Sequence, residues 1–365
     1  MLPNAHDLQY QSYVGTSEKH GKATSLDSRE SCCARPGRRV IPSTDLAMKP
    51  ETVLVTGGAG FIGSHLVDAL LDDGKRVIVI DDMSTGREEW LSTDTEVHAA
   101  DLTDPAVADE VVTETVETVY HLAAKSDVDD DQPSKQFHTN AQMTYNLVEA
   151  AVDTGVSSFV FTSSSTIYGE APQPTPEDFG PLEPISPYGA SKLACEGILS
   201  AAAHTSPLSV YNFRFANIVG PRLRGAVIPD FIEKLQQDPT RLEILGDGRQ
   251  EKSYLHVTDC VEAIRLVTEQ LDPSMISLNL GTRTTTAVDR IATIVAEEMN
   301  LAPELTYTGG DRGWMGDVPR MRLSIEKLAA LGWEPRYESE KAVRRATREL
   351  LEEMDVPSTV AEPAN

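Results

Sequence analysis

Residues 186–192, with the sequence SPYGASK, carry the side chains best suited to acid–base chemistry. Ser186 suits a helix N-cap, and Pro187 suits the first helical position. The pattern therefore predicts that Tyr188 lies in the first helical turn, with Lys192 one turn later on the same face. A base at neutral pH needs a pKa about 3 units below the value near 10 of a free tyrosine, and both an ammonium and the positive end of a helix dipole act in that direction. We predict that Tyr188 is a general base, although a Y-x-x-x-K pair also occurs on ordinary amphipathic surfaces.

A cluster of hydroxyl side chains lies at the end of the predicted strand 158–163 and comprises Ser163, Ser164 and Ser165. Ligands of a parallel sheet bind outside the carboxyl ends of its strands. A serine at this place could therefore hold a substrate hydroxyl against Tyr188. Helix capping is a realistic alternative role for Ser163 and for Ser165.

Three glycines with the spacing G-x-x-G-x-x-G separate a predicted strand, residues 52–56, from a predicted helix, residues 61–71. Gly57 permits the tight turn, Gly60 lets the backbone approach a pyrophosphate, and Gly63 lets the helix pack closely on the strand. A glycine-rich loop alone is often only a tight connection. The strand–turn–helix context here favours dinucleotide binding.

Carboxylates follow the next two predicted strands. Asp81 and Asp82 end the strand at 76–80, about 20 residues beyond the glycines, where a carboxylate would accept hydrogen bonds from ribose hydroxyls. The same carboxylate would repel a 2′-phosphate, which predicts NAD rather than NADP. Asp101, after the strand at 96–100, is a weaker candidate for a contact with the adenine edge, and capping of the next helix is the alternative.

Apolar strands alternate with amphipathic helices along most of the chain. This alternation predicts an α/β fold: a Rossmann-type doubly wound parallel sheet, followed by a smaller mixed α/β C-terminal substrate lobe. Strands are expected at 52–56, 76–80, 96–100, 118–122, 158–163, 208–214, 241–245, 253–257 and 276–280. Helices are expected at 61–71, 137–152, 187–203, 227–237, 258–270, 287–299 and 338–354, with a polar loop at 308–322.

The composition changes along the chain and suggests its divisions. We expect a disordered N-terminal extension at 1–47, a NAD-binding Rossmann domain at 48–220, a partly interleaved substrate-binding lobe at 221–355, and a flexible tail at 356–365. The first 50 residues are polar and aperiodic, and they cannot bury enough apolar surface to offset their ordering entropy. Met48, just before the first predicted strand, is a candidate start site.

The chain of 365 residues is strongly acidic, with 57 Asp and Glu against 32 Lys and Arg. Its formal charge of −25 disfavours nucleic acid and membrane surfaces as partners. Four cysteines without a CxxC pattern argue against a metal site and fit a reducing compartment, so we expect a cytoplasmic protein. Beyond residue 50 only 8 of 25 bases are lysines, which favours a halophilic origin over an ordinary acidic protein.

Together these motifs resemble the extended short-chain dehydrogenase/reductase family, and within it the UDP-glucose 4-epimerases and related nucleotide-sugar epimerases. The resemblance rests on the segments TGGAGFIGSHL, HLAA, FTSSSTIYGE, SPYGASK, RFANIVGPR and SYLHVTD, which occur in order at compatible spacing within residues 51–335. It implies a NAD cofactor and a UDP-sugar substrate, and we expect a homodimer.

The resemblance also implies roles for individual residues. Ser164, Tyr188 and Lys192 fall on the family's catalytic triad. Asn217 falls on a residue that contacts the substrate diphosphate. The candidate cofactor contacts are Gly57, Gly60, Phe61, Ile62, Gly63, Asp81, Asp82, Asp101, Leu102, Leu122, Ala123, Ala124, Asn140, Tyr188 and Lys192.

One departure from the family pattern bears on the reaction. Dehydratases of the family carry Asp-Glu just after the catalytic serine or threonine, and the decarboxylases keep the Glu, whereas this chain has Ser165 and Thr166. Hydroxyls are far weaker acids than carboxyls, so the departure favours epimerisation over dehydration or decarboxylation. Thr166 is itself a candidate substrate contact.

Further departures concern the substrate. Lys252 stands where the family usually has arginine; it keeps the charge but loses the bidentate fork, and it is a candidate phosphate ligand. In the long loop 309–317, Arg312 and Asp317 match diphosphate and ribose contacts, with a solvated charged loop as the alternative. Met321 falls where the family controls the room around the sugar's C2 substituent, and core packing is an equal alternative.

The reaction implied by this resemblance is NAD-dependent epimerisation at C4 of UDP-glucose or UDP-galactose through a transient 4-keto intermediate. Tyr188 would take the C4 hydroxyl proton with help from Ser164, while hydride passes to NAD and returns to the other face. The alternatives are a 4,6-dehydratase or reductase of the same family, or a non-catalytic NAD-binding regulator. The intact triad disfavours the regulator.

Overall fold

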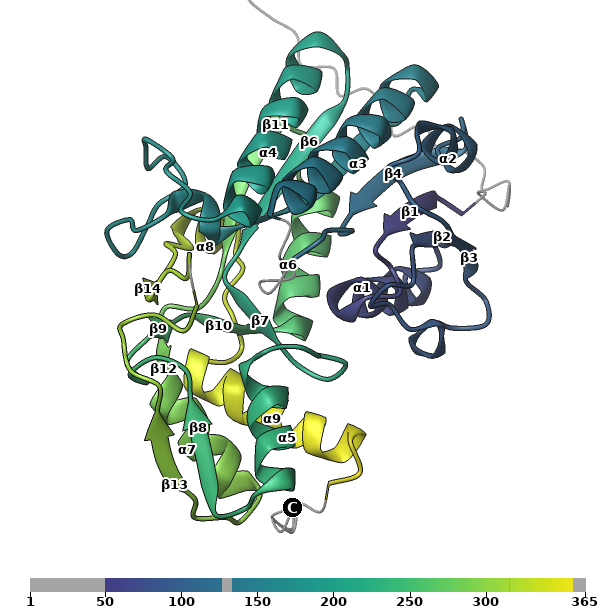
Figure 1. Ribbon diagram of the computed structural model, residues 1–365. Coiled ribbons are helices and arrows are strands. Elements are labelled where there is room, and N and C mark those ends of the chain that lie inside the picture. The colour runs from purple at the N-terminus through teal and green to yellow at the C-terminus, as the bar shows by residue number, and fades with distance from the viewer. Residues whose placement is uncertain (1–49, 127–132, 315, 357–365) are drawn as a thin grey trace, which may run out of the picture. The chain divides into compact units, whose positions relative to one another are not determined.

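The computed structural model describes residues 50–126, 133–314 and 316–356. The predicted extension at 1–47 and the predicted tail beyond Val356 lie outside the described residues. The described elements are shown in Figure 1.

A seven-stranded, entirely parallel sheet forms the main structure, in the order β11-β6-β5-β4-β1-β2-β3 (Figure 1). The strands are β1 (Thr52–Thr56), β2 (Arg76–Asp81), β3 (Glu96–Ala99), β4 (Val116–His121), β5 (Ser158–Ser164), β6 (Ser209–Phe215) and β11 (Met275–Leu280). All five residues of β1 and all seven of β6 are buried, as strands covered on both faces require. Because the strands are parallel, the segments that follow β1, β2, β4 and β5 meet at one edge of the sheet.

Helices cover both faces of this sheet, which confirms the predicted doubly wound fold. On one face lie α1 (Phe61–Asp72), α6 (Val257–Gln270) and the short α8 (Glu326–Ala330). On the other lie α2 (Pro105–Val111), α3 (Pro133–Thr154) and α4 (Pro187–Thr205). Two 3₁₀ turns, η1 (Glu88–Trp90) and η2 (Ser165–Tyr168), follow β2 and β5.

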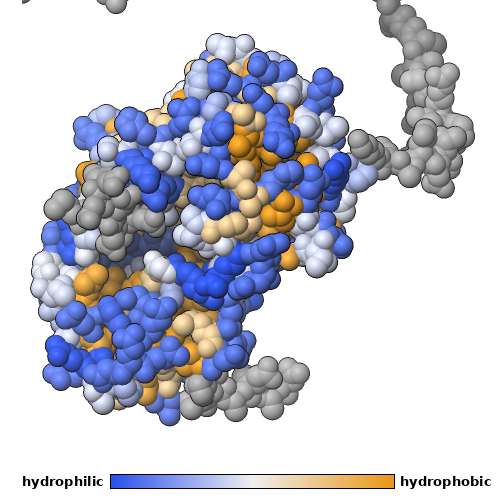
Figure 2. Space-filling view, turned by 45° about the vertical axis from the view of Figure 1, so that its right-hand side comes forward, coloured by the Kyte–Doolittle hydropathy of each residue, from blue (hydrophilic) through white to orange (hydrophobic). Residues whose placement is uncertain are grey.

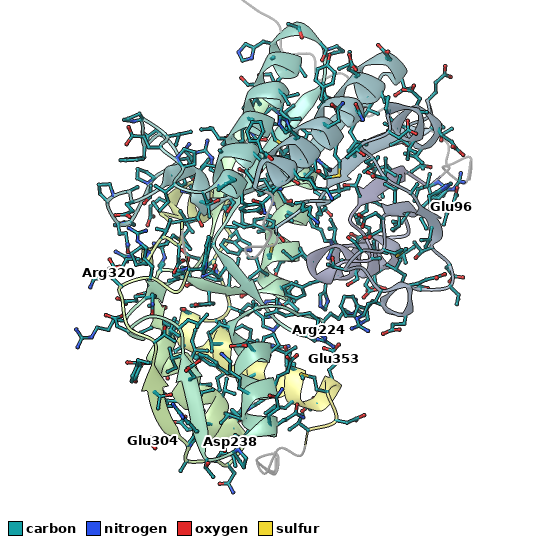
Figure 3. All side chains as sticks on the ribbon, in the orientation of Figure 1. Glu96, Arg224, Asp238, Glu304, Arg320 and Glu353 are labelled. Carbon is teal, nitrogen blue, oxygen red and sulfur yellow. The ribbon has the colours of Figure 1, made fainter. Side chains whose placement is uncertain are left out.

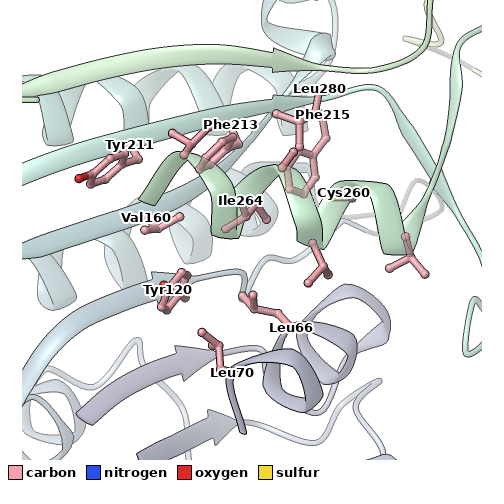
Figure 4. Close-up of a cluster of buried hydrophobic side chains, with 14 of the residues drawn as sticks. Leu66, Leu70, Tyr120, Val160, Tyr211, Phe213, Phe215, Cys260, Ile264 and Leu280 are labelled. Carbon is pink, nitrogen blue, oxygen red and sulfur yellow. The ribbon is translucent and has the colours of Figure 1, made fainter. Parts of the chain in front are cut away.

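The apolar contacts between helices and sheet hold the fold together. In Figure 4, Leu66 and Leu70 of α1 and Ile264 of α6 pack with Tyr120 of β4 and Phe213 of β6. Each of these side chains is 2% exposed or less, and burying one contributes about 1.5–3 kcal/mol. This packing fixes the sheet edge on which the predicted site residues lie.

The C-terminal part has its own apolar core. Its elements are β7 (Asn217–Val219), α5 (Val227–Gln237), β8 (Arg241–Ile244), β9 (Glu251–Lys252), β10 (Tyr254–His256), β12 (Thr286–Ala287), α7 (Val288–Glu298), β13 (Glu304–Tyr307), β14 (Arg320–Met321) and α9 (Ser339–Glu353). The chain after residue 221 does not remain in this part, because α6 and β11 return to the large sheet. The two parts are thus interleaved along the sequence.

Ion pairs attach the segment after β7 to α1 and α9. Arg222 pairs with Asp68 of α1 at 2.9 Å, and Arg224 pairs with Glu353 of α9 at 2.8 Å. Arg224 and Glu353 lie beside each other in Figure 3. The guanidinium of Arg224 also lies 5.7 Å from the ring centroid of Trp90 in η1. The loop after β2 and the C-terminal part are therefore in direct contact.

Candidate active site

The glycine-rich turn between β1 and α1 has the geometry of a phosphate cradle. Gly57 has φ +66°, and a Cβ there would lie 2.7 Å from the backbone nitrogen of Ala123. A Cβ on Gly63 would lie 2.1 Å from the carbonyl oxygen of Gly57, so α1 can pack on the turn only because Gly63 has no side chain. Gly60, the N-cap of α1, supplies no side-chain cap. An anion can therefore approach the N–H groups of the first turn.

Apolar residues surround this turn. Phe61 and Ile62 are half-buried and pack against the core cluster. Residues 122–124 follow β4 directly, and Ala123 donates its N–H to Thr56 Oγ1 at 3.2 Å. The structure thus brings these predicted cofactor contacts together around the cradle.

Asp81 is fixed in place by two backbone donors. Its Oδ2 accepts from Ala59 N at 3.0 Å and its Oδ1 accepts from Met83 N at 2.9 Å. Burial raises the pKa of Asp81, while the two N–H donors oppose that shift. The carboxylate lies against the glycine-rich turn through Ala59. This arrangement fits a dinucleotide whose ribose carries hydroxyls and no 2′-phosphate.

Two other predicted carboxylates lie in exposed turns instead. Asp82 Oδ1 accepts from the backbone N and the hydroxyl of Ser84, at 2.9 and 2.6 Å. Asp101 Oδ1 accepts from the backbone N and the hydroxyl of Thr103, both at 2.8 Å. Asp101 therefore closes a turn before α2 but does not cap that helix, because the N-cap of α2 is Asp104, so the capping alternative for Asp101 is wrong. Leu102 is buried in the core beneath α2.

The segment SPYGASK begins α4 as the sequence predicts. The Ser186 hydroxyl accepts from Gly189 N at 3.1 Å, and Tyr188 lies half-buried in the first turn. Lys192 is 2% exposed, and its Nζ donates to the carbonyl oxygen of Thr162 in β5 at 2.7 Å. The same Nζ lies 5.8 Å from the ring centroid of Tyr188. The amine is therefore held between α4 and the end of β5.

The pKa of Tyr188 is shifted in the direction opposite to the one expected from the sequence. Burial raises the pKa of Tyr188 to about 12 and lowers that of Lys192 to about 8. The reason is that desolvation penalises both charged forms, and the Lys192 ammonium is directed at the Thr162 carbonyl rather than at the phenol.

Ser164 and Thr166 lie directly against the start of α4. Ser164, the last residue of β5, caps η2 by accepting from Thr166 N at 3.2 Å, and the Thr166 hydroxyl donates to Ser164 Oγ at 2.9 Å. A Cβ on Gly189 would lie 2.7 Å from the carbonyl oxygen of Thr166, so η2 and the first turn of α4 are in close backbone contact. The structure thereby brings Ser164, Tyr188 and Lys192 to one place at the edge of the sheet.

Asn140 of α3 has its polar atoms engaged by the protein. Its Oδ1 accepts from Lys125 N at 2.7 Å, and its Nδ2 donates to Lys125 O at 3.1 Å and to Ser191 Oγ at 3.0 Å. These bonds join the segment after β4 to α4. Asn140 therefore links α3 to α4 and to the segment after β4.

The charged residues predicted to contact substrate are paired with one another. Lys252 Nζ bonds Asp317 Oδ1, and Asp317 Oδ2 accepts from Gly313 N at 3.2 Å. Arg312 donates to the backbone oxygen of Asp317 and pairs with the carboxylate of Glu170. Three predicted residues therefore form one cluster, in which carboxylates engage both cations. A bound diphosphate would compete with these carboxylates.

The two remaining predicted substrate residues, Asn217 and Met321, lie next to Ser253 and Lys252, respectively. Asn217 begins β7, and its N–H donates to Ser253 O at 3.2 Å. Met321 is 8% exposed and packs with Ile167, Tyr168 and Leu323. Met321 therefore has the core-packing contacts that the sequence left as an alternative, directly beside η2.

Two buried polar residues at this edge were not among the predicted site residues. His121, the last residue of β4, bonds Thr56 Oγ1 at 2.7 Å and Thr144 Oγ1 at 3.0 Å, and burial lowers its pKa to about 3. Arg214 of β6 is 6% exposed and pairs with Glu196 of α4 at 2.7 Å. The available signal was a histidine or an arginine at the carboxyl end of a predicted strand.

Comparisons with known proteins agree with this geometry. The chain is 36% identical over 296 residues to the UDP-glucose 4-epimerase of Mycolicibacterium smegmatis, covering 77% of this chain and 93% of that relative. A crystal structure of a UDP-galactose 4-epimerase aligns with a TM-score of 0.76 and 41% identity, over 83% of this chain and 99% of that chain. The UDP-glucose 4-epimerase of Thermotoga maritima with UDP-glucose aligns with a TM-score of 0.77 and 32% identity, over 83% and 99%.

A family-level match completes the assignment and confirms the resemblance in the sequence. Residues 53–281 match the NAD dependent epimerase/dehydratase family, a span that runs from β1 to the end of β11. It therefore includes the glycine cradle, Asp81 and the cluster of Ser164, Tyr188 and Lys192. This chain belongs to the NAD dependent epimerase/dehydratase family.

Proposed function

We propose that the protein interconverts UDP-glucose and UDP-galactose by NAD-dependent epimerisation at C4. The observation that carries the proposal is the convergence of Ser164, Tyr188 and Lys192 at the sheet edge that also holds the glycine cradle. The names of the relatives, UDP-glucose 4-epimerases, support it. So does the absence of carboxyl groups at Ser165 and Thr166, where a dehydratase has its acids.

In the proposed mechanism, Tyr188 takes the proton of the C4 hydroxyl, and Ser164 holds that hydroxyl by a hydrogen bond. The glycine cradle and Asp81 would hold NAD, which when bound would supply the chemistry of taking a hydride from C4 and returning it to the other face. Lys192 holds a positive charge beside the phenol ring. Lys252 and Arg312 anchor the diphosphate. The 4-keto sugar can then rotate about the bond that joins it to the diphosphate before it is reduced.

The test is an incubation with UDP-glucose and no added cofactor, followed by analysis of the sugar. We expect UDP-galactose to form with no net change in reduced cofactor, because the cofactor is regenerated in each cycle. A stable 4-keto product would instead indicate a dehydratase, and net production of NADH would indicate a dehydrogenase or reductase. NAD binding without turnover of any nucleotide sugar would indicate a regulator.

We expect Asp81→Asn to weaken NAD binding roughly 10-fold and to narrow the preference for NAD over NADP. A hydrogen bond to a charged group contributes about 1.5–3 kcal/mol, and removal of the charge also removes the repulsion of a 2′-phosphate. Titration of the purified apoprotein with both cofactors measures the two affinities. Asp104→Asn is the matched control, because Asp104 caps α2 from a nearby exposed loop and asparagine caps equally well. An unaltered preference in Asp81→Asn would place the ribose contact elsewhere.

We propose that Met321 sets the space around the sugar's C2 substituent and admits N-acetyl forms with weaker turnover than UDP-glucose. Methionine is flexible and can move aside at modest cost. We expect Met321→Gly to raise the activity on the N-acetyl substrate relative to UDP-glucose, and Met321→Tyr to lower it. The ratio of kcat/KM values on the two substrates measures the effect. If both variants move this ratio in the same direction, Met321 serves only the core formed with Ile167, Tyr168 and Leu323.

We also propose that the carboxylate excess is an adaptation to high salt. On the face shown in Figure 2, hydrophilic side chains cover most of the surface. On the exposed surface, Arg283 bridges Glu326 and Glu334, and Arg290 bridges Glu297 and Glu340. The formal charge of −25 already counts these arginines, so the carboxylates still exceed the cations by 25 after all such pairs are formed.

We expect the melting temperature to rise by several degrees between about 0.1 M and about 2 M KCl, because the Debye length falls from about 10 Å to below 3 Å and screens the self-repulsion. Thermal unfolding at several KCl concentrations measures this. Sucrose at equal osmolality is the control for exclusion of a solute from the surface. A melting temperature that stays level or falls with KCl would indicate an ordinary acidic protein.

We propose, finally, that the protein is a cytoplasmic homodimer that binds no nucleic acid. No helix among the described residues is both long and apolar enough to cross a membrane. Light scattering of the purified protein tests the oligomeric state. An electrophoretic shift assay with duplex DNA tests the absence of nucleic-acid binding, for which the acidic composition is the support.

A further inference from the structure

A buried ion pair joins the helix that carries Tyr188 to the central sheet. Arg214 in β6 forms a bidentate contact with Glu196 in α4, at 3.0 Å from Nε to Oε1 and 2.7 Å from Nη2 to Oε2. Their side chains are each 7% exposed. Glu196 lies one turn after Lys192 and two turns after Tyr188, so all three are on one face of α4.

The other side of the same guanidinium reaches the opposite half of the site. Arg214 Nη1 donates to Tyr168 OH at 2.7 Å and to Glu177 O at 2.9 Å. Tyr168 ends η2, the turn that begins directly after Ser164. The guanidinium also lies 5.1 Å from the Tyr168 ring centroid. A single side chain thus contacts both α4 and η2.

The side chain of Asn279, which is fully buried, extends this hydrogen-bond network to β11. Tyr168 OH donates to Asn279 Oδ1 at 2.8 Å, and Asn279 N donates to Glu177 Oε1 at 3.0 Å. Asn279 Nδ2 donates to Thr175 O at 3.0 Å. The loop between η2 and α4 is therefore attached to β11 through Asn279.

Because η2 and the first turn of α4 touch through backbone at Gly189, a small rotation of α4 would change the separation of the Tyr188 and Ser164 hydroxyls. Arg214 and Glu196 fix α4 at a second point, so the rotation is opposed. We propose that the Arg214–Glu196 pair is a positioning element that sets the spacing between Tyr188 and Ser164. The inference rests on the proposed epimerase function and names residues that act through others.

The chemistry of the pair supports this role over a purely stabilising one. A buried ion pair is weak evidence for stability, because the desolvation of two charges offsets most of their attraction. The planar guanidinium, in contrast, directs its donors at fixed angles to Glu196, Tyr168 and the loop backbone at once. An apolar pair of similar volume could fill the space but could not fix these directions.

The test compares four variants by kcat, KM for UDP-glucose, retained NAD and melting temperature. We expect Arg214→Met to lower kcat roughly 10–100-fold with KM changed by less than about threefold, because small misplacements of reacting groups cost rates of this order. Arg214→Lys keeps the charge and loses the fork, and we expect an intermediate kcat. We expect the double variant Arg214→Met with Glu196→Met to regain the melting temperature without regaining kcat.

Arg348→Met is the control for the loss of an arginine that pairs with a buried carboxylate: Arg348, itself 51% exposed, pairs at 2.7 Å with Glu298, which is 2% exposed, in the C-terminal part. Because Glu298 keeps its pair with Arg344 at 2.6 Å, we expect a small decrease in melting temperature and an unchanged kcat. A double variant with wild-type kcat would show that the pair serves stability alone, and so would a change confined to KM in Arg214→Lys; either result overturns the inference. An inactive wild type would overturn the proposed function as well. The two failures are therefore distinguishable.

Discussion

Replacement of Tyr188 by phenylalanine will reduce turnover of UDP-glucose roughly 10²–10⁴-fold and leave NAD bound, because a positioned general acid–base contributes rates of this size. The substitution removes one hydroxyl and keeps the ring that packs beside Lys192. The capping contact from Ser186 to Gly189 involves no atom of the lost group. The rate of UDP-galactose formation, together with the NAD that co-purifies, measures the two effects separately.

Tyr145→Phe is the control for this experiment. Tyr145 lies on α3 with 48% of its surface exposed, and its hydroxyl donates to Glu149 at 2.8 Å. The same chemical change there should leave turnover at the wild-type value. If Tyr188→Phe turns over substrate at a rate near that of the wild type, another group must take the C4 proton and the proposed mechanism is wrong.

Replacement of Gly63 by alanine will cause a large loss of cofactor binding. The new Cβ would lie 2.1 Å from the Gly57 carbonyl oxygen and 2.8 Å from Gly58 Cα, both of them backbone atoms that cannot rotate away. The first turn of α1 must therefore move, at a cost of roughly 1–3 kcal/mol of folding free energy. We expect NAD affinity to fall roughly 100-fold, since the displaced N–H groups are those that would face the phosphates.

Gly197→Ala is the matched control for the added methyl group. Gly197 lies inside α4, is exposed, and has no atom within 4 Å of an added Cβ. Alanine there should stabilise the protein by about 0.5–1 kcal/mol, because glycine loses more backbone entropy on entering a helix. Chemical denaturation and NAD titration of both variants provide the comparison. A Gly63→Ala protein that binds NAD as tightly as the wild type would show that the cradle tolerates a shifted helix.

Much of the fold follows from short-range sequence patterns. The predicted strand at 52–56 and the predicted helix at 227–237 have the bounds found for β1 and α5. The helix at 187–203 differs from α4 by two residues at its C-terminal end. Periodicity and caps determine such elements locally, because each depends on residues within a turn or two. Short edge elements such as β12 and β14 were not predicted, since two-residue pairings have no pattern of their own.

The candidate site, like the fold, was predicted only in part from the sequence. Local sequence determined the glycine cradle, the cap that places Tyr188 in the first turn, and the presence of Ser164 at a strand end. Only the tertiary structure decided that Lys252 pairs with Asp317, 65 residues away, and that Tyr168 bonds Asn279, 111 residues away. It also decided the pKa of Tyr188, which burial raises to about 12, opposite to the direction expected from the helix start and the nearby amine. Desolvation depends on everything packed around a group, and no stretch of neighbouring residues contains that information.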